Sequence, residues 1–441
     1  MNVVVLVVDR LHAGFLGCYG NTWVSTPALD RLSIESFVFD QALAGGPRLS
    51  DAYAGYWFAR HAAARHDPRA AALAAVMRAA GYRTTLLSDD DRVISLEGAD
   101  AFEDSVVVEP LDAWQAAAEF EDTHLARYFA AATDTLQSAQ RPFLLWLHTR
   151  GLGGAWDAPR EFRTQYAEED EAEPPRFVEV PRFTLEADHD PDRLWAIAQA
   201  YAGQVSLLDA CLGVFVETLR RGPWEDDTLL VVTAPRGFPL GGHGDVGAEH
   251  DALYGELLHT PLLMRFPKAD SEADAPAGPD SGATAGRVPS GCSSAASNRL
   301  GQADRTQALT QPLDLFATLL DVCGIPSPAS SLGQSQLPII RGESQPSEFR
   351  DRLCVFAAEG EQAIRTPAWF LRSSPLADAA SPHLELFAKP DDRYEFNNVA
   401  DRCPPIAAGL QEALTAFRET LAADPLARSA PLREELTTPP E

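Results

Sequence analysis

Charged residues follow two short apolar runs of the sequence, at the point where each run ends. Asp9 and Arg10 come directly after the run at 3–8, and Arg236 lies just after the run at 228–233. If both runs are parallel strands of one sheet, their carboxyl ends lie at the same edge, and these side chains converge there. An arginine offers a fixed charge and a fork of donors, so Asp9 could form a buried ion pair with it. Asp9 could equally help to hold a divalent cation, or cap the following helix.

The pattern of apolar residues predicts the sheet that would hold these side chains. Four short apolar runs are typical of strands buried on both faces, and they lie at 3–8, 84–88, 143–148 and 228–233. The segments between them include amphipathic stretches with helical spacing, at 70–80, 111–137 and 194–221. Strands that alternate with long helices indicate an α/β fold with a three-layer, doubly wound and largely parallel sheet.

The chain divides into three predicted parts, an α/β domain over 1–345, a small α+β subdomain with an antiparallel sheet over 346–425, and a frayed tail over 426–441. The subdomain is predicted from strand-like runs that begin near residue 353 and from a helix near 406–422. Residues 268–306 are rich in Ala, Ser, Gly and Pro and carry almost no large apolar side chain. Such a segment cannot bury enough apolar surface to offset its ordering entropy, so we expect a disordered insertion there.

Charge and composition argue against several classes of protein. The chain has 36 basic and 64 acidic side chains and a formal net charge of −28, whereas a nucleic-acid binder needs a basic surface. The apolar runs are far shorter than the roughly 20 residues that span a bilayer, so we expect no membrane association. The six cysteines form no C-x-x-C pair, and Met1 is followed by no basic and apolar leader. We therefore expect a cytoplasmic protein, whose oligomeric state the sequence leaves open.

A set of recognisable segments is spaced in order from residue 2 to about residue 401. They read NVVVLVVDRLHAGFLGCYGN at 2–21, TPALDRL at 26–32, YAGQVSLLDACLGVFVETLRRGPWEDDTLLVV at 201–232, LGGHG at 240–244, LYGELLHTPLLMRFP at 253–267, DLFATLL at 314–320, CGIPSP at 323–328 and ELFAKPDDRYEFNNVAD at 385–401. Together they resemble the sulfatase family of the alkaline-phosphatase superfamily, which implies an alkaline-phosphatase-like fold. The resemblance also implies a cysteine or serine oxidised to formylglycine, in a C/S-x-P/A-x-R signature, beside a divalent cation held by carboxylates.

The chain differs from that family at several residue positions of the active site. The segment where the nucleophile should lie, LAGGPRLSDAYAGYW at 43–57, has no cysteine and no such signature, and Ser50 carries its only Ser or Thr hydroxyl. The family's later Asp-His or Asp-Asn pair is replaced by Ala-Pro-Arg at 234–236, and an arginine is a poor neighbour for a cation. The family's lysine and histidine after the second strand are replaced by DDDR at 89–92, and its next histidine is replaced within the glycine-rich 151–154.

We therefore expect a pseudoenzyme without a cofactor, which binds a small anionic ligand or a protein partner and no nucleic acid. Arg10, Arg48 and Arg236 are the candidate anion-binding residues. Asp9 is the one surviving ligand position of the metal site, which we expect to be empty.

The alternative is a hydrolase of sulfuric or phosphoric esters that works through an altered site with Ca²⁺ or Mg²⁺. Ser50, His148 and His243 are its candidate catalytic residues, together with Asp9 and Arg236. A structural protein that binds no ligand is the third possibility.

Several of these residues also have a purely structural interpretation. His148 and His243 are typical of histidines satisfied within a core or loop, and Ser50 is typical of a helix N-cap. The acidic segment at 89–91 is typical of a solvated turn rather than a metal cluster. The G-x-G-x-x-G pattern at 242–247 lies too far beyond the preceding strand for a dinucleotide site.

Overall fold

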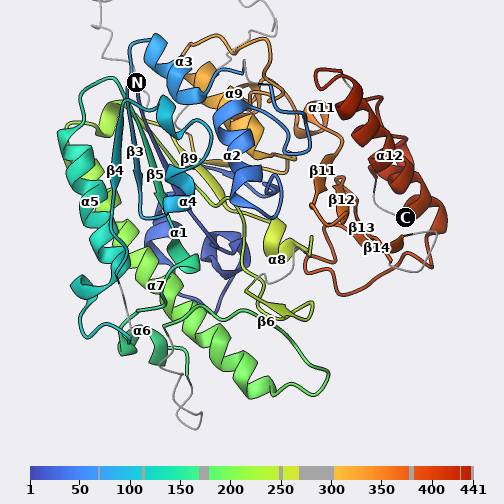
Figure 1. Cartoon of the computed structure of the whole chain (residues 1–441), viewed down its shortest axis with the longest axis horizontal. Coiled ribbons are helices and arrows are strands. Elements are labelled where there is room, and N and C mark those ends of the chain that lie inside the picture. The colour runs from blue at the N-terminus through green and yellow to red at the C-terminus, as the bar shows by residue number, and fades with distance from the viewer. Residues whose placement is uncertain are drawn as a thin grey trace, which may run out of the picture.

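The computed structural model describes residues 1–67, 70–111, 115–167, 178–247, 252–267, 302–376, 382–427 and 429–438. Its central feature is an eight-stranded sheet with the strand order β10-β2-β9-β7-β1-β5-β3-β4 (Figure 1). These strands are β1 Asn2–Val8, β2 Phe37–Phe39, β3 Arg83–Ser88, β4 Asp104–Val107, β5 Phe143–Thr149, β7 Thr228–Thr233, β9 Leu262–Arg265 and β10 Asp304–Thr306. Among the described pairings of this sheet, those of β9 with β2 and β7 are antiparallel and the others are parallel. The predicted largely parallel sheet is confirmed.

Side chains of β1 alternate between two hydrophobic cores, one on each face of the sheet. Val4, Leu6 and Val8 belong to the first core, whereas Val3 and Val7 belong to the second. Both sets are buried because β1 lies between β5 and β7 in the middle of the sheet. A strand covered on both faces needs a continuous apolar run, which is why this sequence shows no polar alternation.

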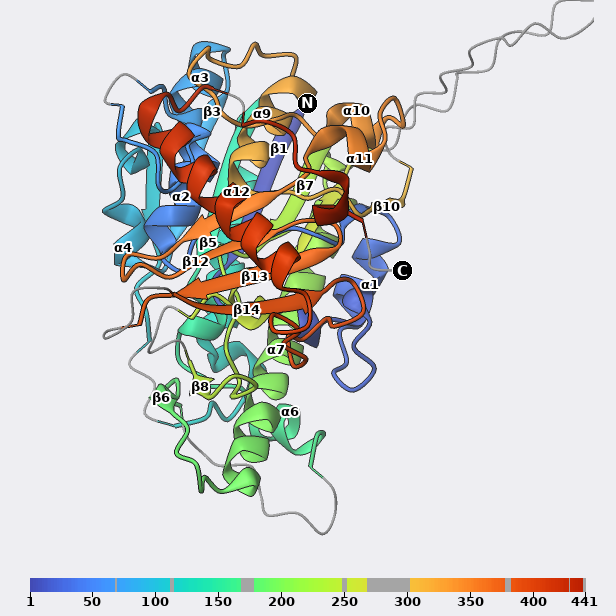
Figure 2. The same cartoon turned by 90° about the vertical axis from the view of Figure 1, so that its right-hand side faces the viewer.

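Helices cover both faces of this sheet and complete the three layers (Figures 1 and 2). The first core contains residues of α1 Pro27–Ser33, α5 His124–Ser138 and α7 Pro191–Arg221. The second contains residues of α2 Leu49–Phe58, α3 Leu73–Ala79, α9 Pro312–Val322 and α10 Leu337–Ile340. Shorter elements are α4 Asp91–Ile94, α6 Arg160–Thr164, α8 Gly255–Leu258, and the short antiparallel pair of β6 Phe183–Thr184 and β8 Asp245–Val246.

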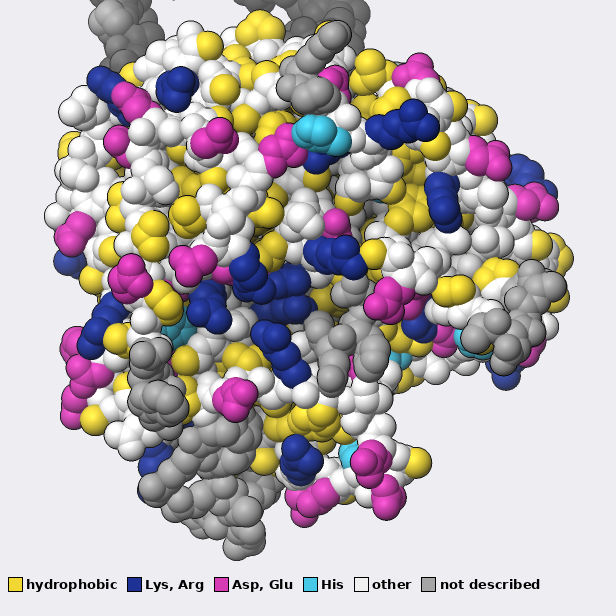
Figure 3. Space-filling model, viewed as in Figure 1, with side chains coloured by type: hydrophobic (Ala, Val, Ile, Leu, Met, Phe, Trp, Pro, Cys, Tyr) yellow, Lys and Arg dark blue, Asp and Glu magenta, His cyan; other side chains and the backbone are white. Residues whose placement is uncertain are grey.

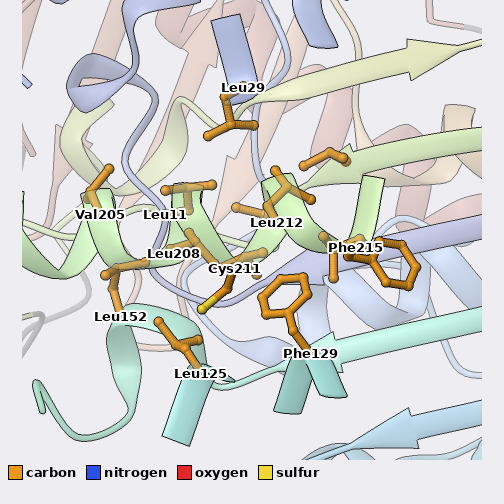
Figure 4. Packing of buried hydrophobic residues seen from close by; sticks show 14 of the residues in the cluster. Leu11, Leu29, Leu125, Phe129, Leu152, Val205, Leu208, Cys211, Leu212 and Phe215 are labelled. Atoms are coloured by element: carbon orange, nitrogen blue, oxygen red, sulfur yellow. The ribbon is translucent and has the colours of Figure 1, made fainter. Parts of the chain in front are cut away.

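The long helix α7 packs on α5 across the first core. Leu208, Leu212 and Phe215 lie beside Leu125 and Phe129 in this core (Figure 4). Of the described helices, α7 alone is long and apolar enough to cross a membrane, and 72% of that stretch is buried inside the protein. The core helix of a globular domain passes the same test, because its apolar positions are covered by other elements.

A second sheet and a helix form the C-terminal subdomain. The sheet is antiparallel, with the order β11 Leu353–Phe356, β12 Gln362–Arg365, β13 Trp369–Ser374 and β14 His383–Ala388. The helix α12 Pro404–Ala423 covers one face of this sheet (Figure 2), and the turn-like α11 Pro346–Phe349 precedes the sheet. The other face packs on Leu253 and Leu258 of the α/β domain, through Phe370 and Phe387. The predicted antiparallel α+β unit is confirmed.

Two predicted unstructured segments need correction at the residues that the structure describes. Asp304–Thr306, the end of the segment expected to be disordered, form β10 and pair with β2, while residues 268–301 lie outside the described residues. In the tail expected to be frayed, Leu436 is 2% exposed and belongs to the core beneath α12. The backbone there is also held, since Leu432 donates to Asp351 at 2.8 Å. Strand pairing at 304–306, and the buried Leu436 with the Leu432 hydrogen bond in the tail, therefore order residues whose composition alone suggests disorder.

Candidate functional site

Asp9 and Arg236 meet at the carboxyl ends of β1 and β7 as a buried ion pair. Arg236 donates through Nε to Oδ1 of Asp9 at 2.9 Å and through Nη2 to Oδ2 at 3.0 Å. Its remaining nitrogen, Nη1, donates to the carbonyl of Pro47 at 2.9 Å. Burial acts to raise the pKa of Asp9, but the charge and hydrogen bonds of Arg236 outweigh it and hold the pKa at about 2. The convergence expected from the sequence is therefore present as a two-pronged contact.

An arginine follows each of the four central parallel strands. They are Arg10 after β1, Arg92 after β3, Arg150 after β5 and Arg236 after β7. Because the carboxyl ends of neighbouring parallel strands lie at one edge, the topology places all four at that edge. Figure 3 shows Lys and Arg side chains gathered in the region that Figure 1 shows between α4 and α8. A chain with a net charge of −28 thus concentrates positive charge where its fold gathers functional residues.

Arg10 is a buried arginine without a described carboxylate partner. Its Nη1 donates to the carbonyl of Gly237 at 3.3 Å, and no ion pair to a carboxylate forms among the described residues. Its backbone adopts a left-handed φ of 66°, and its own carbonyl accepts a 2.6 Å hydrogen bond from the Tyr201 hydroxyl. Burial and the nearby charge of Arg236 lower the pKa of Arg10 to about 9, although the charge of Asp9 acts in the opposite direction. An anion beside this guanidinium would supply the missing counter-charge.

A chain of polar contacts runs from α2 to α4 and ends beside Asp9. The Tyr53 hydroxyl lies 2.6 Å from Nδ1 of His148, and Nε2 of His148 lies 3.8 Å from Oδ2 of Asp90. Asp90 accepts from Arg92 Nε at 2.9 Å and from Nη2 at 2.6 Å. Nη2 of Arg92 also lies 3.7 Å from Oδ2 of Asp9. His148 is fully buried, and its Nε2 has no hydrogen-bond partner within the described part of the chain.

Two other predicted residues lie on the loop and helix that border the ion pair. Ser50 is exposed in the first turn of α2, and Arg48 is exposed just before that helix. The backbone nitrogen of Arg48 donates to Oδ2 of Asp51 at 3.0 Å, so Asp51 satisfies the start of α2. Arg48 follows Pro47, the residue whose carbonyl accepts from Arg236. Among the described residues, the Ser50 hydroxyl forms no hydrogen bond with Asp9 or with a histidine.

His243 is held by a different group of residues. Its Nε2 hydrogen-bonds to the carbonyl of Tyr394 at 3.0 Å. Its ring stacks on Tyr254 with 3.6 Å between centroids, and Phe396 stacks at 5.4 Å. The structure thus places His243 against the C-terminal subdomain, and it does not bring His243 into contact with the Asp9–Arg236 pair.

The acidic segment at 89–91 is only in part the solvated turn that its composition suggests, because Asp91 is exposed but Asp89 and Asp90 are buried. Asp89 and Asp90 are only 4% and 3% exposed. Asp89 accepts from the Thr149 hydroxyl at 3.0 Å and from the backbone nitrogen of Arg150 at 2.7 Å, while Asp90 accepts from the backbone nitrogen of Arg92 at 3.0 Å. These acids are buried because they tie the end of β3 to the end of β5 and begin α4.

The described residues do not fit the divalent cation that the family resemblance implies. Both carboxylate oxygens of Asp9 bind Arg236, and positions 234 and 235 are Ala and Pro, which carry no ligand atom. Within the described ranges, no group of three or more His, Cys, Asp or Glu side chains is arranged to hold a metal ion. A hard cation needs several oxygen ligands to replace its water, and this edge offers guanidinium groups instead.

Sequence reasoning missed Arg92, Arg150 and Tyr53 as members of this edge. The two arginines carried a usable signal, since each follows a predicted strand as Arg10 and Arg236 do. Tyr53 carried none, because its role depends on α2 placing its hydroxyl against a histidine of β5.

Comparisons with known proteins agree on one family. A family model described as Sulfatase matches residues 1–325. Arylsulfatase D of Homo sapiens is 37% identical over 60 residues, which are 14% of this chain and 10% of that protein. N-acetylglucosamine-6-O-sulfatase of Bacteroides thetaiotaomicron is 25% identical over 151 residues, which are 34% of this chain and 21% of that protein. The matched segments thus span a quarter or less of these curated relatives.

Solved structures share the fold over nearly the whole chain. A protein in complex with its substrate D-glucosamine-2-N,6-O-disulfate superposes with a TM-score of 0.69 at 15% identity, covering 96% of this chain and 98% of the other. The phosphonate monoester hydrolase of Agrobacterium radiobacter superposes with a TM-score of 0.69 at 18% identity, covering 95% and 96%. At such low identity, these likenesses establish the alkaline-phosphatase-like fold alone.

Proposed function

Because this chain belongs to the sulfatase family, we propose that it is a pseudoenzyme that uses the carboxyl edge of its central sheet to bind an anion without a divalent cation. The Asp9–Arg236 ion pair fills the position that a cation would otherwise occupy. Arg10 binds the anion, and Arg48 borders the site. The ligand is a small molecule or a group on a partner that carries a sulfate or phosphate, since a guanidinium fork matches such tetrahedral oxyanions.

The unpaired burial of Arg10 carries this proposal. Burial and the neighbouring Arg236 both disfavour the charge of Arg10, and Asp9, whose two carboxylate oxygens bind Arg236, offsets only part of that cost. Arg92 and Arg182 add further positive charge nearby. An anion bound between Arg10 and Arg236 relieves this repulsion. The overall charge of −28 repels extended polyanions at long range, so the ligand is small and is not a nucleic acid.

An ester hydrolase with an altered site is the second candidate, and one observation favours it. His148 is buried, held at Nδ1 by Tyr53, and leaves its Nε2 facing Asp90 beside the ion pair. Such a histidine could move a proton. The candidate nucleophile Ser50 is exposed, and His243 contacts the C-terminal subdomain, so these groups do not assemble around His148. The pseudoenzyme therefore accounts for more of the edge.

Calorimetric titration with inorganic sulfate and phosphate tests the proposal. We expect binding by the wild type in the presence of EDTA, and at least a tenfold loss of affinity in Arg10→Gln, a loss of about 1.4 kcal/mol or more. Arg31→Gln, an exposed arginine of α1, is the matched control and should bind as the wild type does. Binding that needs an added cation, or that Arg10→Gln leaves unchanged, would contradict the proposal. Hydrolysis of p-nitrophenyl sulfate or phosphate that is lost in His148→Ala would favour the hydrolase instead.

A further inference from the structure

A cavity of about 240 Å³ lies between the α/β domain and the C-terminal subdomain, and neither Asp9 nor Arg236 lines it. The α/β domain contributes Asp40 after β2, His259 before β9 and Arg305 of β10. The subdomain contributes Arg365 of β12 and the loop after β14, which carries Arg393. Because both domains line the cavity, a molecule bound there would touch both.

The cavity is lined by more positively charged than negatively charged side chains. It is lined by four cationic side chains, Arg305, Arg365, Lys389 and Arg393, and by two carboxylates, Asp40 and Glu395. Arg305 pairs with Asp40 at 2.6 Å, and Lys389 pairs with Glu395. Arg365 and Arg393 form no ion pair with a carboxylate among the described residues. Two positive charges of this cavity therefore lack a counter-charge.

Arg365 is the more deeply buried of these two arginines, at 6% exposure. Its Nη2 donates to Oε1 of Gln41 at 2.9 Å, and its Nη1 donates to the carbonyls of Thr366 and Trp369. These partners accept hydrogen bonds but carry no charge. Burial lowers the pKa of Arg365 to about 10, and the more distant Glu395 offsets only part of that cost. A buried guanidinium that has lost its hydrating water and has only uncharged hydrogen-bond partners carries an unfavourable desolvation cost.

Arg393 extends the positive charge across the cavity. Its guanidinium carbon lies 5.5 Å from the ring centroid of Tyr394, a contact that orients the side chain without neutralising it. Burial, with the charge of Arg393, lowers the pKa of His259 to about 3. His259 is thus neutral near pH 7, and its Nε2 donates to the carbonyl of Asp40 at 2.9 Å. The histidine adds polarity to the wall but no further charge.

We propose that this cavity binds a small organic dianion, a phosphate monoester or a dicarboxylate, between Arg365 and Arg393. Two unpaired arginines match two negative charges, and a guanidinium binds phosphate or carboxylate oxygens in pairs. The walls also include Leu43, Leu258 and Phe370, which suit the carbon skeleton of an organic ligand better than a bare ion. Such a ligand would link the C-terminal subdomain to the sheet edge formed by β2 and β10. This site is independent of the one under the proposed function.

Calorimetric titration of the full chain with glycerol 3-phosphate and with succinate tests this site, with glycerol as the uncharged control. We expect at least one dianion to bind with a Kd below about 1 mM and glycerol to give no signal. Arg393→Gln, on a partly exposed loop, should weaken binding at least tenfold, and so should Arg365→Gln where it folds. Arg402→Gln, an exposed arginine of the same subdomain, should leave the affinity unchanged.

The pattern of ligands identifies the chemistry. Binding of glycerol 3-phosphate alone supports a phosphate monoester, binding of succinate alone supports a dicarboxylate, and binding of both supports recognition by charge. Failure of both to bind at about 10 mM would overturn the proposal. So would binding that Arg393→Gln does not weaken, because the dianion would then occupy another site, such as the edge near Arg10.

Discussion

Asp9 and Arg236 stand 227 residues apart in the chain, yet they share two hydrogen bonds of 2.9 and 3.0 Å in the interior. The two residues meet because β1 and β7 are neighbouring parallel strands that end at the same edge. The planar fork of the Arg236 guanidinium binds both carboxylate oxygens of Asp9 and so fixes the direction of that side chain. The pair therefore organises the edge on which the proposed anion site depends.

Breaking this pair from one side should be costly. We expect Asp9→Ala to lower the free energy of unfolding by about 3–5 kcal/mol, because it leaves Arg236 buried without its counter-charge. Urea denaturation of the single variants and of Asp9→Ala with Arg236→Met measures the coupling. The double variant should lose less stability than the sum of the two single losses. Additive losses, or an Asp9→Ala variant as stable as the wild type, would show that the pair does not hold the edge.

The loss of folding stability at low pH should depend on the Asp9 carboxylate. The pKa of Asp9 falls from 3.8 to about 2 on folding, so the folded state binds its proton less readily than the unfolded state. Its stabilisation is therefore fully present above the unfolded pKa and is lost as the pH falls through about 2. That shift corresponds to about 2 kcal/mol. Asp9→Asn should consequently lose less stability than the wild type between about pH 5 and pH 2, measured by urea denaturation. Parallel curves for the two proteins would contradict this assignment.

Gly151 should tolerate no side chain, because it abuts the backbone that carries Asp9. Its φ is +50°, and a Cβ there would lie 2.5 Å from Cγ1 of Val8 and 2.8 Å from the carbonyl oxygen of Asp9. Gly81 is the matched control, since its φ is +93° but nothing lies within 4 Å of its Cβ position. Gly81→Ala should cost about 1–2 kcal/mol for the left-handed backbone alone, and Gly151→Ala should cost clearly more. Equal changes in melting temperature would show that the loop moves away without strain.

Glu256 should weaken the fold as the pH rises through neutrality. Burial raises its pKa to about 7, although the backbone nitrogen of Gly242 donates to Oε1 at 3.2 Å. A folded pKa above the unfolded value means that the favourable protonated form is lost as the pH rises. Glu256→Gln should therefore be more stable than the wild type by about 3 kcal/mol near pH 8, and similar to it near pH 4. A variant that is equally stable or less stable at the higher pH would refute this explanation.

The sequence was most informative about the strands that position the edge. The buried runs gave β1, β3, β5 and β7 within a residue of their observed bounds, since only strands covered on both faces need such continuous apolar runs. The convergence of Asp9 and Arg236 followed from the topology of a parallel sheet. The apolar runs, together with the rule that parallel strands end at one edge, were sufficient to predict the position of these residues.

Other features depended on contacts between distant segments. The unpaired state of Arg10 depends on a left-handed backbone held by Tyr201 and on the carbonyl of Gly237, neither of which leaves a local pattern. His243 looked like a member of the edge, but stacking on Tyr254 draws it toward the C-terminal subdomain. The cavity with Arg365 exists only because two domains meet. These three features depend on tertiary packing, which the sequence pattern does not show.

Thermal unfolding with EDTA, with millimolar Ca²⁺ or Mg²⁺, and with sulfate tests the central claim most directly. A specific cation site at hundredfold saturation would add about 2.7 kcal/mol, a shift of a few degrees for a chain of this size. We predict no shift with either cation, and a rise in melting temperature with sulfate that Arg10→Gln abolishes. A clear rise with Ca²⁺ or Mg²⁺ that Asp9→Ala removes would contradict the account and establish Asp9 as a metal ligand.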